Sequence, residues 1–288
     1  MELHESTRSR LRASDVQRPF TAVRSIGLDL GSVLDRCRAY EPLLRGGDAF
    51  SHQTAAMLLG APLPTTSPVL HMIAPPGFVR PRGRGVIGHT SREAVPVVLR
   101  LGLPVVEPAL VWCQLAATLD RADLVAVGDA FVTGARTRGI RGAALTDQVA
   151  LAGAVARWAS RRGARHLAWA LPRVRAGAES RPESLTRLVL VEHGLPEPAL
   201  NDPTPMVDGS VLHPDLKWEH WRIVLEYEGD GHRTSRTTWQ RDIRRKRDFE
   251  AAGWTVIRVT SDDLFVDQAA FIRRVRAQIA LAEARRPR

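Results

Sequence analysis

Two short runs of alternating apolar and polar residues constrain the fold of this chain more than any other feature. They lie within residues 211 to 228, VLHPDLKWEHWRIVLEYE, and a short polar segment separates them. Alternation with a period of two is typical of a strand that buries one face, so the pair of runs predicts a β-hairpin. With Glu219 and His220 as the turn, Trp218 pairs with Trp221 across the hairpin.

This register sorts the side chains of the hairpin by their chemistry. One face is apolar and carries Leu216, Trp218, Trp221, Ile223, Leu225 and Tyr227. The opposite face carries Asp215, Lys217, Arg222, Val224, Glu226 and Glu228. Because successive side chains of a strand point to opposite faces, a slip by one residue would mix the two sets. The segregation therefore supports the register, and it gathers three acids on one face.

Three carboxylates on one face repel one another unless protons or a cation neutralise them. Hard oxygen ligands of this kind suit Mg²⁺ or Mn²⁺. The alternative is an exposed polar face on which acids gather by chance, although a solvent face more naturally alternates acids with bases. The pattern therefore predicts a divalent metal on Asp215, Glu226 and Glu228, and no small-molecule cofactor is expected.

Two further residues are candidates for the same site. The sequence Ser-Arg-Pro-Glu from Ser180 to Glu183 has the spacing of a capping box and predicts the start of a helix. Glu183 therefore either stabilises the first turn of that helix or joins the acids. His232 ends the sequence Gly-Asp-Gly-His after the second strand, where it could serve as a metal ligand, a general base or a surface turn residue.

A strongly basic segment follows the acids. Residues 238 to 252 have a helical pattern that stops at Gly253. Seven basic residues fall within the fifteen positions from 233 to 247, and the candidates for DNA contact among them are Arg233, Arg236, Arg241, Arg244 and Arg245. We expect these side chains to bind the phosphate backbone, with a solvated helix face as the alternative. A second candidate is the loop of residues 75 to 88, which contains Arg80, Arg82 and Arg84.

The elements predicted after residue 178 follow the order helix, hairpin, helix, strand, helix. Four short sequence motifs occur within these elements: Glu-Ser-Arg-Pro-Glu-Ser at 179 to 184, Pro-Asp-Leu at 214 to 216, Leu-Glu-Tyr-Glu-Gly-Asp-Gly-His at 225 to 232, and Arg-Asp at 241 to 242. Together they resemble the very-short-patch repair endonucleases of the PD-(D/E)XK restriction-endonuclease-like superfamily. The resemblance implies an α/β nuclease domain over residues 178 to 288, with a mixed sheet flanked by helices.

The same resemblance implies metal-dependent hydrolysis of DNA phosphodiesters. Asp215 and Glu226 would hold Mg²⁺ or Mn²⁺, which generates the attacking water. Glu228 would be a further ligand or orient that water, and Glu183 would complete the outer shell. His232 would protonate the leaving oxygen or position the water.

One residue departs from the superfamily pattern. Glu228 stands where lysine is usual, and Lys217, on the same predicted face, belongs to the other strand. A second interpretation is therefore a DNA-binding, antitoxin-like regulator whose nuclease fold lacks turnover. A third is an adaptor that only binds a partner.

Residues 1 to 175 are expected to form a separate α+β domain. Residues 46 to 132, with AFSHQTAAMLLGAPLP and LGLPVVEPALVWCQLA, resemble the amino-terminal part that is often joined to such a nuclease domain. That part resembles antitoxins of the abortive-infection type. That resemblance implies a DNA-binding winged helix, which residues 1 to 45 do not show. Helices are predicted at residues 108 to 119, 124 to 133 and 145 to 161.

The composition agrees with a polyanionic partner such as DNA. Forty-one Lys and Arg against 31 Asp and Glu give a formal net charge of +10. Cys37 and Cys113 are far apart and lack metal-ligand spacing, which argues against a zinc site or a disulfide framework. Residues 1 to 18 contain no apolar signal region, and no stretch approaches the ~18 apolar residues of a membrane helix. We therefore expect a cytoplasmic protein.

Overall fold

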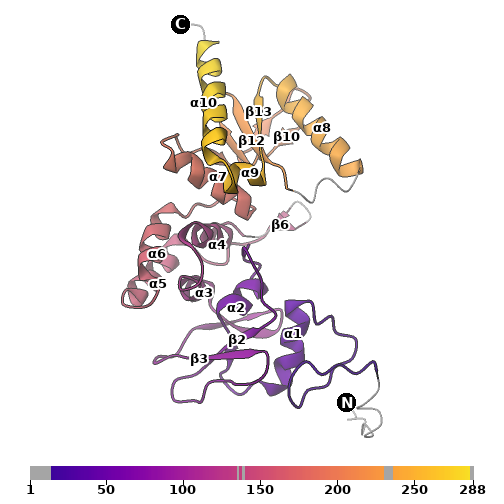
Figure 1. The fold of residues 1–288 in the computed structure, drawn as a ribbon, viewed down its shortest axis with the longest axis vertical. Coiled ribbons are helices and arrows are strands. Elements are labelled where there is room, and N and C mark those ends of the chain that lie inside the picture. Colours follow the sequence, from indigo (N-terminus) through magenta and orange to yellow (C-terminus); the bar gives the residue numbers. More distant parts are fainter. Residues whose placement is uncertain (1–13, 135, 138–139, 230–235, 286–288) are drawn as a thin grey trace. The chain divides into compact units, whose positions relative to one another are not determined.

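A computed structural model describes residues 14–134, 136–137, 140–229 and 236–285 (Figure 1). The chain divides into two compact units, one of residues 1–124 and 145–172 and the other of residues 125–144 and 173–288. The second unit thus includes the segment 125–144, which precedes the boundary drawn from the sequence. Within that segment the buried carboxylate of Asp129 pairs with the guanidinium of Arg187 at 2.9 Å, which ties the segment to the second unit.

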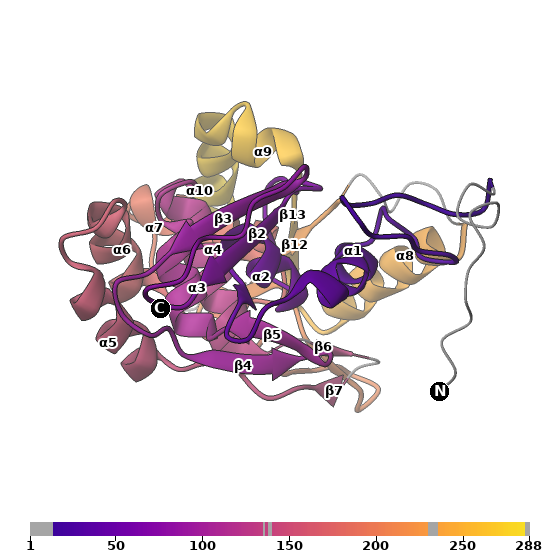
Figure 2. The ribbon, with the colours of Figure 1, turned by 90° about the horizontal axis from the view of Figure 1, so that it is seen from below.

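A mixed five-stranded sheet forms the centre of the first unit (Figure 2). The strand order is β3-β2-β1-β5-β4, with β2 parallel to β3 and β1 parallel to β5. The strands are β1 (Ala49–Phe50), β2 (Leu70–Ala74), β3 (Val86–Thr90), β4 (Val97–Arg100) and β5 (Leu103–Val106).

Helix α2 (His52–Leu58) packs on this sheet, and α1 (Val33–Tyr40), α3 (Pro108–Leu115), α5 (Gln148–Trp158) and α6 (Ala164–Ala170) pack on α2 or on one another. Helix α4 (Arg121–Thr133) begins in this unit and continues into the second. Two short 3₁₀ turns are η2 (Glu41–Leu43) and η3 (Leu171–Arg173). The predicted helices of this region are confirmed as α3, α4 and α5. Trp112 of α3 is fully buried, and its indole N–H donates to the carbonyl of Leu124 at 2.7 Å, so the core of this unit holds α3 against α4.

The second unit contains a mixed four-stranded sheet of order β13-β12-β11-β8 with helices on both sides (Figure 1). Its strands are β8 (Ala199–Leu200), β11 (Leu216–Trp218), β12 (Ile223–Tyr227) and β13 (Thr255–Val259), and its helices are α7 (Arg181–Glu192), α8 (Arg236–Ala251), α9 (Ser261–Phe265) and α10 (Gln268–Ala284). Two small ribbons pair β6 (Arg136–Thr137) with β7 (Ile140–Arg141) and β9 (Thr204–Pro205) with β10 (Val211–Leu212). The predicted α/β class, with mixed sheets flanked by helices, is confirmed.

The hairpin of β11 and β12 has a four-residue turn, and the predicted two-residue turn was wrong. The paired residues are Leu216–Leu225, Lys217–Val224 and Trp218–Ile223, which leaves residues 219–222 in the turn. Arg222 ends this turn with a positive φ of 50°. Its guanidinium donates to the backbone carbonyls of Ala252 and Gly253, so a contact from outside the hairpin fixes the turn.

This correction shifts the pairing by two residues, which keeps the strand side chains on their predicted faces. Trp221 leaves the apolar face, because it lies in the turn, where its indole N–H donates to Glu283 at 3.2 Å. The face that carries the acids is covered by α8, not exposed. There Val224 is fully buried and packs with Met206, Phe249 and Trp254.

Candidate metal-binding site

Asp215 and Glu226 occupy neighbouring positions at one end of the hairpin. Asp215 directly precedes β11, and Glu226 lies on β12 one step beyond the pair of Leu216 and Leu225. Residues opposite each other in an antiparallel pair point to the same face, so both carboxylates share one side of the sheet. The backbone N–H of Tyr227 donates to Oδ2 of Asp215 at 2.7 Å and fixes that carboxyl group.

Burial dominates the electrostatics of Asp215. Burial, together with the charges of Glu226 and Glu183, raises the pKa of Asp215 to about 8, against the smaller effects of the Tyr227 N–H and Arg245. A carboxyl group with this pKa is mostly protonated at neutral pH. The site therefore favours any cation that can share its oxygens.

Glu183 is buried in the first turn of α7, beside Asp215. The hydroxyl of Ser180 caps this helix by accepting from the Glu183 N–H at 3.4 Å. Oε2 of Glu183 accepts from the Glu179 N–H at 2.8 Å and from the Asn201 amide at 2.6 Å. Burial also raises the pKa of Glu183. Glu183 therefore has both of the roles considered for it: it stabilises the first turn of α7, and it adds negative charge beside Asp215.

The carboxylate of Glu226 is held by Arg245 of α8. Nε of Arg245 lies 2.8 Å from Oε2, and Nη2 lies 3.0 Å from Oε1, which makes a two-bond ion pair. Nη2 also donates to the backbone carbonyl of His213. The sequence assigned Arg245 to the DNA backbone, but in this structure it is turned into the acid site. The reason is electrostatic, because the acids attract the nearest cation of α8.

Glu228 has a different partner. It pairs with Arg258 of β13, and both side chains are partly exposed. A cleft of about 810 Å³ contains Glu228 together with Asp215, Glu226, Asp242, Lys246 and Arg258. The three predicted metal ligands therefore line one cleft.

The acids share this cleft without meeting at one point. Among the residues that the structure describes, the side chains whose ligand atoms all lie within 4.8 Å of one another are His52, His71 and His89 of the first unit. In the acid cleft, Arg245 holds Glu226 and Arg258 holds Glu228, so each acid is drawn to its own partner. Closer approach of the carboxylates requires a cation between them.

Lys217 does not reach the acid cleft. Its ammonium group lies 2.8 Å from Asp202 and 3.0 Å from Glu219 and sits over the ring of Trp254, towards the turn of the hairpin. It therefore does not replace the missing lysine. The cations that line the cleft are Arg245, Lys246 and Arg258.

The remaining predicted residues are placed only in part. His232 and Arg233 lie outside the described residues. Arg236 and Arg241 belong to α8, but the positions of their side chains are not described. Arg244 is exposed on α8, as a residue that contacts DNA must be.

Asn201 and Arg258 complete the site, and sequence reasoning did not select them. Asn201 has a positive φ of 47°, and its amide bridges Glu183 and the carbonyl of Gly177. Arg258 lies on a strand that is parallel to β12 and opposite Glu226 in register. Neither residue has a local sequence signal, because each partner is more than fifteen positions away.

Comparisons with known proteins give relatives from one species. No family model matches the chain, and no solved structure matches it. Two proteins of Mycobacterium tuberculosis, from strains CDC 1551 and H37Rv, are each 29% identical to it over 234 residues. This stretch covers 81% of the chain and 81% of each relative, and both relatives are described as uncharacterized. Within the described ranges, no helix has the length and apolar character needed to cross a membrane.

Proposed function

We propose that the second unit is a metal-dependent nuclease with a restriction-endonuclease-like fold, and that it hydrolyses DNA phosphodiesters. The observation that carries this proposal is the placement of Asp215 and Glu226 opposite each other on adjacent strands, with the pKa of Asp215 raised to about 8. The order of α7, the hairpin of β11 and β12, α8 and β13 also agrees with the nuclease fold that the sequence resembles.

The residues of the cleft fit a hard divalent cation. Asp215 and Glu226 offer carboxylate oxygens in a partly buried position, which are the ligands that Mg²⁺ and Mn²⁺ prefer. The pKa of Asp215 is raised mainly by burial and then by the charges of Glu226 and Glu183, so a cation bound here would stabilise the ionised carboxylate. When bound, such an ion lowers the pKa of a coordinated water and polarises a phosphate oxygen.

The chain's own residues hold and tune this pair of ligands. The Tyr227 N–H fixes Asp215, while Arg245 fixes Glu226. Asn201 and the Glu179 N–H hold Glu183, which keeps a further negative charge behind Asp215. Glu228 would orient water or add a ligand after release from Arg258.

Cations at the cleft supply the charge that the superfamily takes from its lysine. Arg245 and Lys246 come from α8, and Arg258 comes from β13. Guanidinium groups bind phosphate oxygens through charge-assisted hydrogen bonds. We assign these side chains to holding the scissile phosphate at the acids.

Cleavage of supercoiled plasmid DNA with Mn²⁺ tests this function. The wild type should nick or linearise the plasmid, and Asp215→Asn should reduce cleavage to background because it removes a metal ligand. Asp208→Asn is the matched control, since Asp208 is exposed in the turn between β9 and β10. Equal activity in the wild type and Asp215→Asn would contradict the proposal.

A regulator without turnover is the second candidate. The Glu226–Arg245 pair and the acid at position 228 favour it, since both weaken a metal-dependent centre. Wild-type protein that binds DNA but leaves it intact with Mg²⁺ and Mn²⁺ would identify this alternative.

A further inference from the structure

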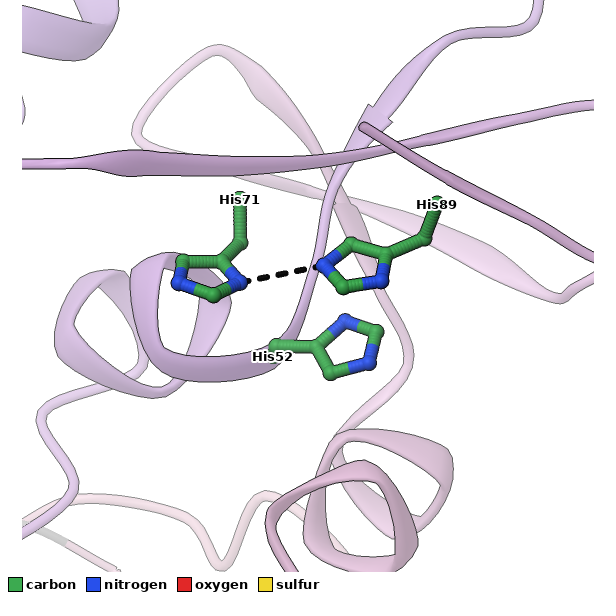
Figure 3. A group of neighbouring side chains, drawn as sticks. All are labelled: His52, His71 and His89. Carbon is green, nitrogen blue, oxygen red and sulfur yellow. Dashed lines mark hydrogen bonds between the residues drawn. The ribbon is translucent and has the colours of Figure 1, made fainter. Parts of the chain in front are cut away.

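Three histidines that are distant in the sequence meet in the first unit (Figure 3). His52 is the first residue of α2, His71 lies on β2 and His89 lies on β3. The parallel strands pair His71 with Ile87 and Ile73 with His89, so the two strand histidines are two positions apart on the same face of the sheet. His52 enters from the end of β1, which pairs with β2.

The three rings are close enough to share one ion. Nδ1 of His71 lies 3.0 Å from Nε2 of His89, and Figure 3 shows these two nitrogens pointing at each other. The rings of His52 and His89 stack with centroids 3.7 Å apart. One nitrogen from each of the three residues lies within 4.8 Å of the others.

We propose that His52, His71 and His89 form a transition-metal site that binds Zn²⁺ through three imidazole nitrogens and leaves a coordination position open to a small ligand. Zinc takes nitrogen ligands at about 2.0 to 2.1 Å, so two ligands of a tetrahedral ion lie about 3.3 Å apart. The 3.0 Å between His71 and His89 needs only a few tenths of an ångström more. The His52 ring must turn from its stacked position to complete the site.

The protonation state of the three rings suits metal binding. Burial lowers the pKa of His52 to about 3, with smaller effects from His89 and His71. Burial lowers the pKa of His89 to about 4 and also lowers that of His71. All three imidazoles are therefore neutral at pH 7, the form that binds metals. One of the two facing nitrogens of His71 and His89 carries the hydrogen of their shared hydrogen bond, so metal binding requires that hydrogen to move to the other nitrogen of its ring.

The backbone at His52 adopts a conformation that is uncommon for a histidine. Its φ is 49°, in the left-handed region that favours glycine. The N–H of His52 donates to the buried side chain of Gln114 at 2.8 Å, which holds this conformation. A backbone conformation of this kind is concentrated at functional sites, and here it turns the ring towards the other two histidines.

The surroundings of the site supply partners for the rings and room for a fourth ligand. Nδ1 of His52 lies 3.1 Å from the hydroxyl of the buried Ser51, a contact of the kind that orients metal-binding histidines. A cavity of about 110 Å³ opens beside His52 and His89, with Ser91, Gln114 and Arg161 in its lining. The lining also includes the apolar side chains of Ile73, Val95 and Leu110. Water or a small anion fits this space, and Arg161 favours the anion.

This site is independent of the nuclease proposal, because it lies in the other unit and uses different ligands. The spacing of the two cysteines argued against a zinc site with Cys ligands, and a site made only of histidines does not depend on that spacing. Tests of the two sites can therefore fail separately.

Metal titration of the full chain tests the site. Protein freed of metal with a chelator is dialysed against Zn²⁺, and its zinc content is measured. Co²⁺ then serves as a spectroscopic probe, because Co²⁺ with four ligands absorbs visible light more strongly than hydrated Co²⁺. The wild type should bind one ion at the histidines and show this absorption, and His89→Asn and His71→Gln should each remove the absorption and weaken binding at this site at least about 10-fold.

Controls separate the site from other histidines and from loss of folding. His166→Gln is the matched control, because His166 belongs to the same unit, is exposed and lies outside the cluster. Asp215→Asn should keep the Co²⁺ spectrum. If a cluster variant does not fold by circular dichroism, Ser51→Ala in folded protein replaces it and should weaken Zn²⁺ binding. A wild type without bound Zn²⁺, or cluster variants that bind it as tightly, would overturn the proposal.

Discussion

The guanidinium of Arg245 holds the carboxylate of Glu226 through two hydrogen bonds, of 2.8 Å and 3.0 Å. The same guanidinium lowers the pKa of Asp215 only slightly against burial and the neighbouring acids. Arg245 therefore stabilises the acid site as an internal cation and competes with any metal for Glu226.

Replacing Arg245 should expose this competition. We expect Arg245→Gln to destabilise the metal-free protein by roughly 1 to 3 kcal/mol, because Glu226 loses its partner in a partly buried site. The same variant should bind Mn²⁺ more tightly than the wild type and cleave DNA more slowly. Thermal unfolding and Mn²⁺ titration measure the two effects. Arg244→Gln is the control on the neighbouring exposed position, and lower Mn²⁺ affinity in Arg245→Gln would show that Arg245 does not compete with the metal.

The stability of the metal-free protein should depend on pH through Asp215. Its folded pKa is raised to about 8, above the unfolded value near 3.9, so the folded state binds the extra proton between these limits. Stability is therefore highest at the acid end of this range and falls as the pH rises towards 8. Asp215→Asn removes this loss, and we expect it to raise stability by roughly 1 to 3 kcal/mol at pH 8 and by little at pH 5. Urea unfolding at both values checks this, and a variant that is less stable than the wild type at pH 8 would contradict it.

Helix α8 should bind DNA without selecting sequence. Arg244 and Arg247 are exposed on this helix next to the acid cleft, while Arg245 is held by Glu226. The double variant Arg244→Gln, Arg247→Gln should weaken binding to every duplex tested. The slope of log affinity against log salt should flatten by up to about 0.9 for each lost phosphate contact. An unchanged slope and affinity would mean a solvated face, and the loop with Arg80, Arg82 and Arg84 would be tested next.

A buried ion pair should control the folding of the second unit. Asp129 and Arg187 are almost fully buried, 2.9 Å apart, and Asp129 also accepts from the Ser184 hydroxyl at 2.7 Å. Asp129→Asn removes the buried counter-ion of Arg187 and leaves only the partly exposed Glu197 as its partner, so we expect a loss of about 3 to 5 kcal/mol in the free energy of unfolding. Denaturant unfolding measures this loss. Glu250→Gln, which breaks an exposed pair with Lys246, should change stability by less than about 1 kcal/mol.

The sequence by itself determined which side chains of the hairpin share a face. The alternation around Asp215 and Glu226 is local, because successive residues of any strand point to opposite sides. A second local pattern, the spacing of Ser180 and Glu183, predicted the start of α7, where the Ser180 hydroxyl caps the helix. Helical periodicity likewise placed α3, α4 and α5, since an apolar stripe recurs within a single element.

Only the tertiary structure decided the contacts between segments that are distant in the sequence. The turn of the hairpin has four residues because Arg222 reaches the carbonyls of Ala252 and Gly253, the two residues that follow α8. Glu226 received Arg245 as its partner because α8 covers the acid face, a placement that no local pattern encodes.

The three histidines show most clearly that local sequence patterns do not predict contacts between distant segments. His52, His71 and His89 have no common spacing, and each alone has an ordinary sequence context. The pairing of β1 with β2 and of β2 with β3 brings them to one face of one sheet. Strand order and register depend on burial of the whole core, so the sequence set the local pattern of each strand and the folded sheet set which side chains meet.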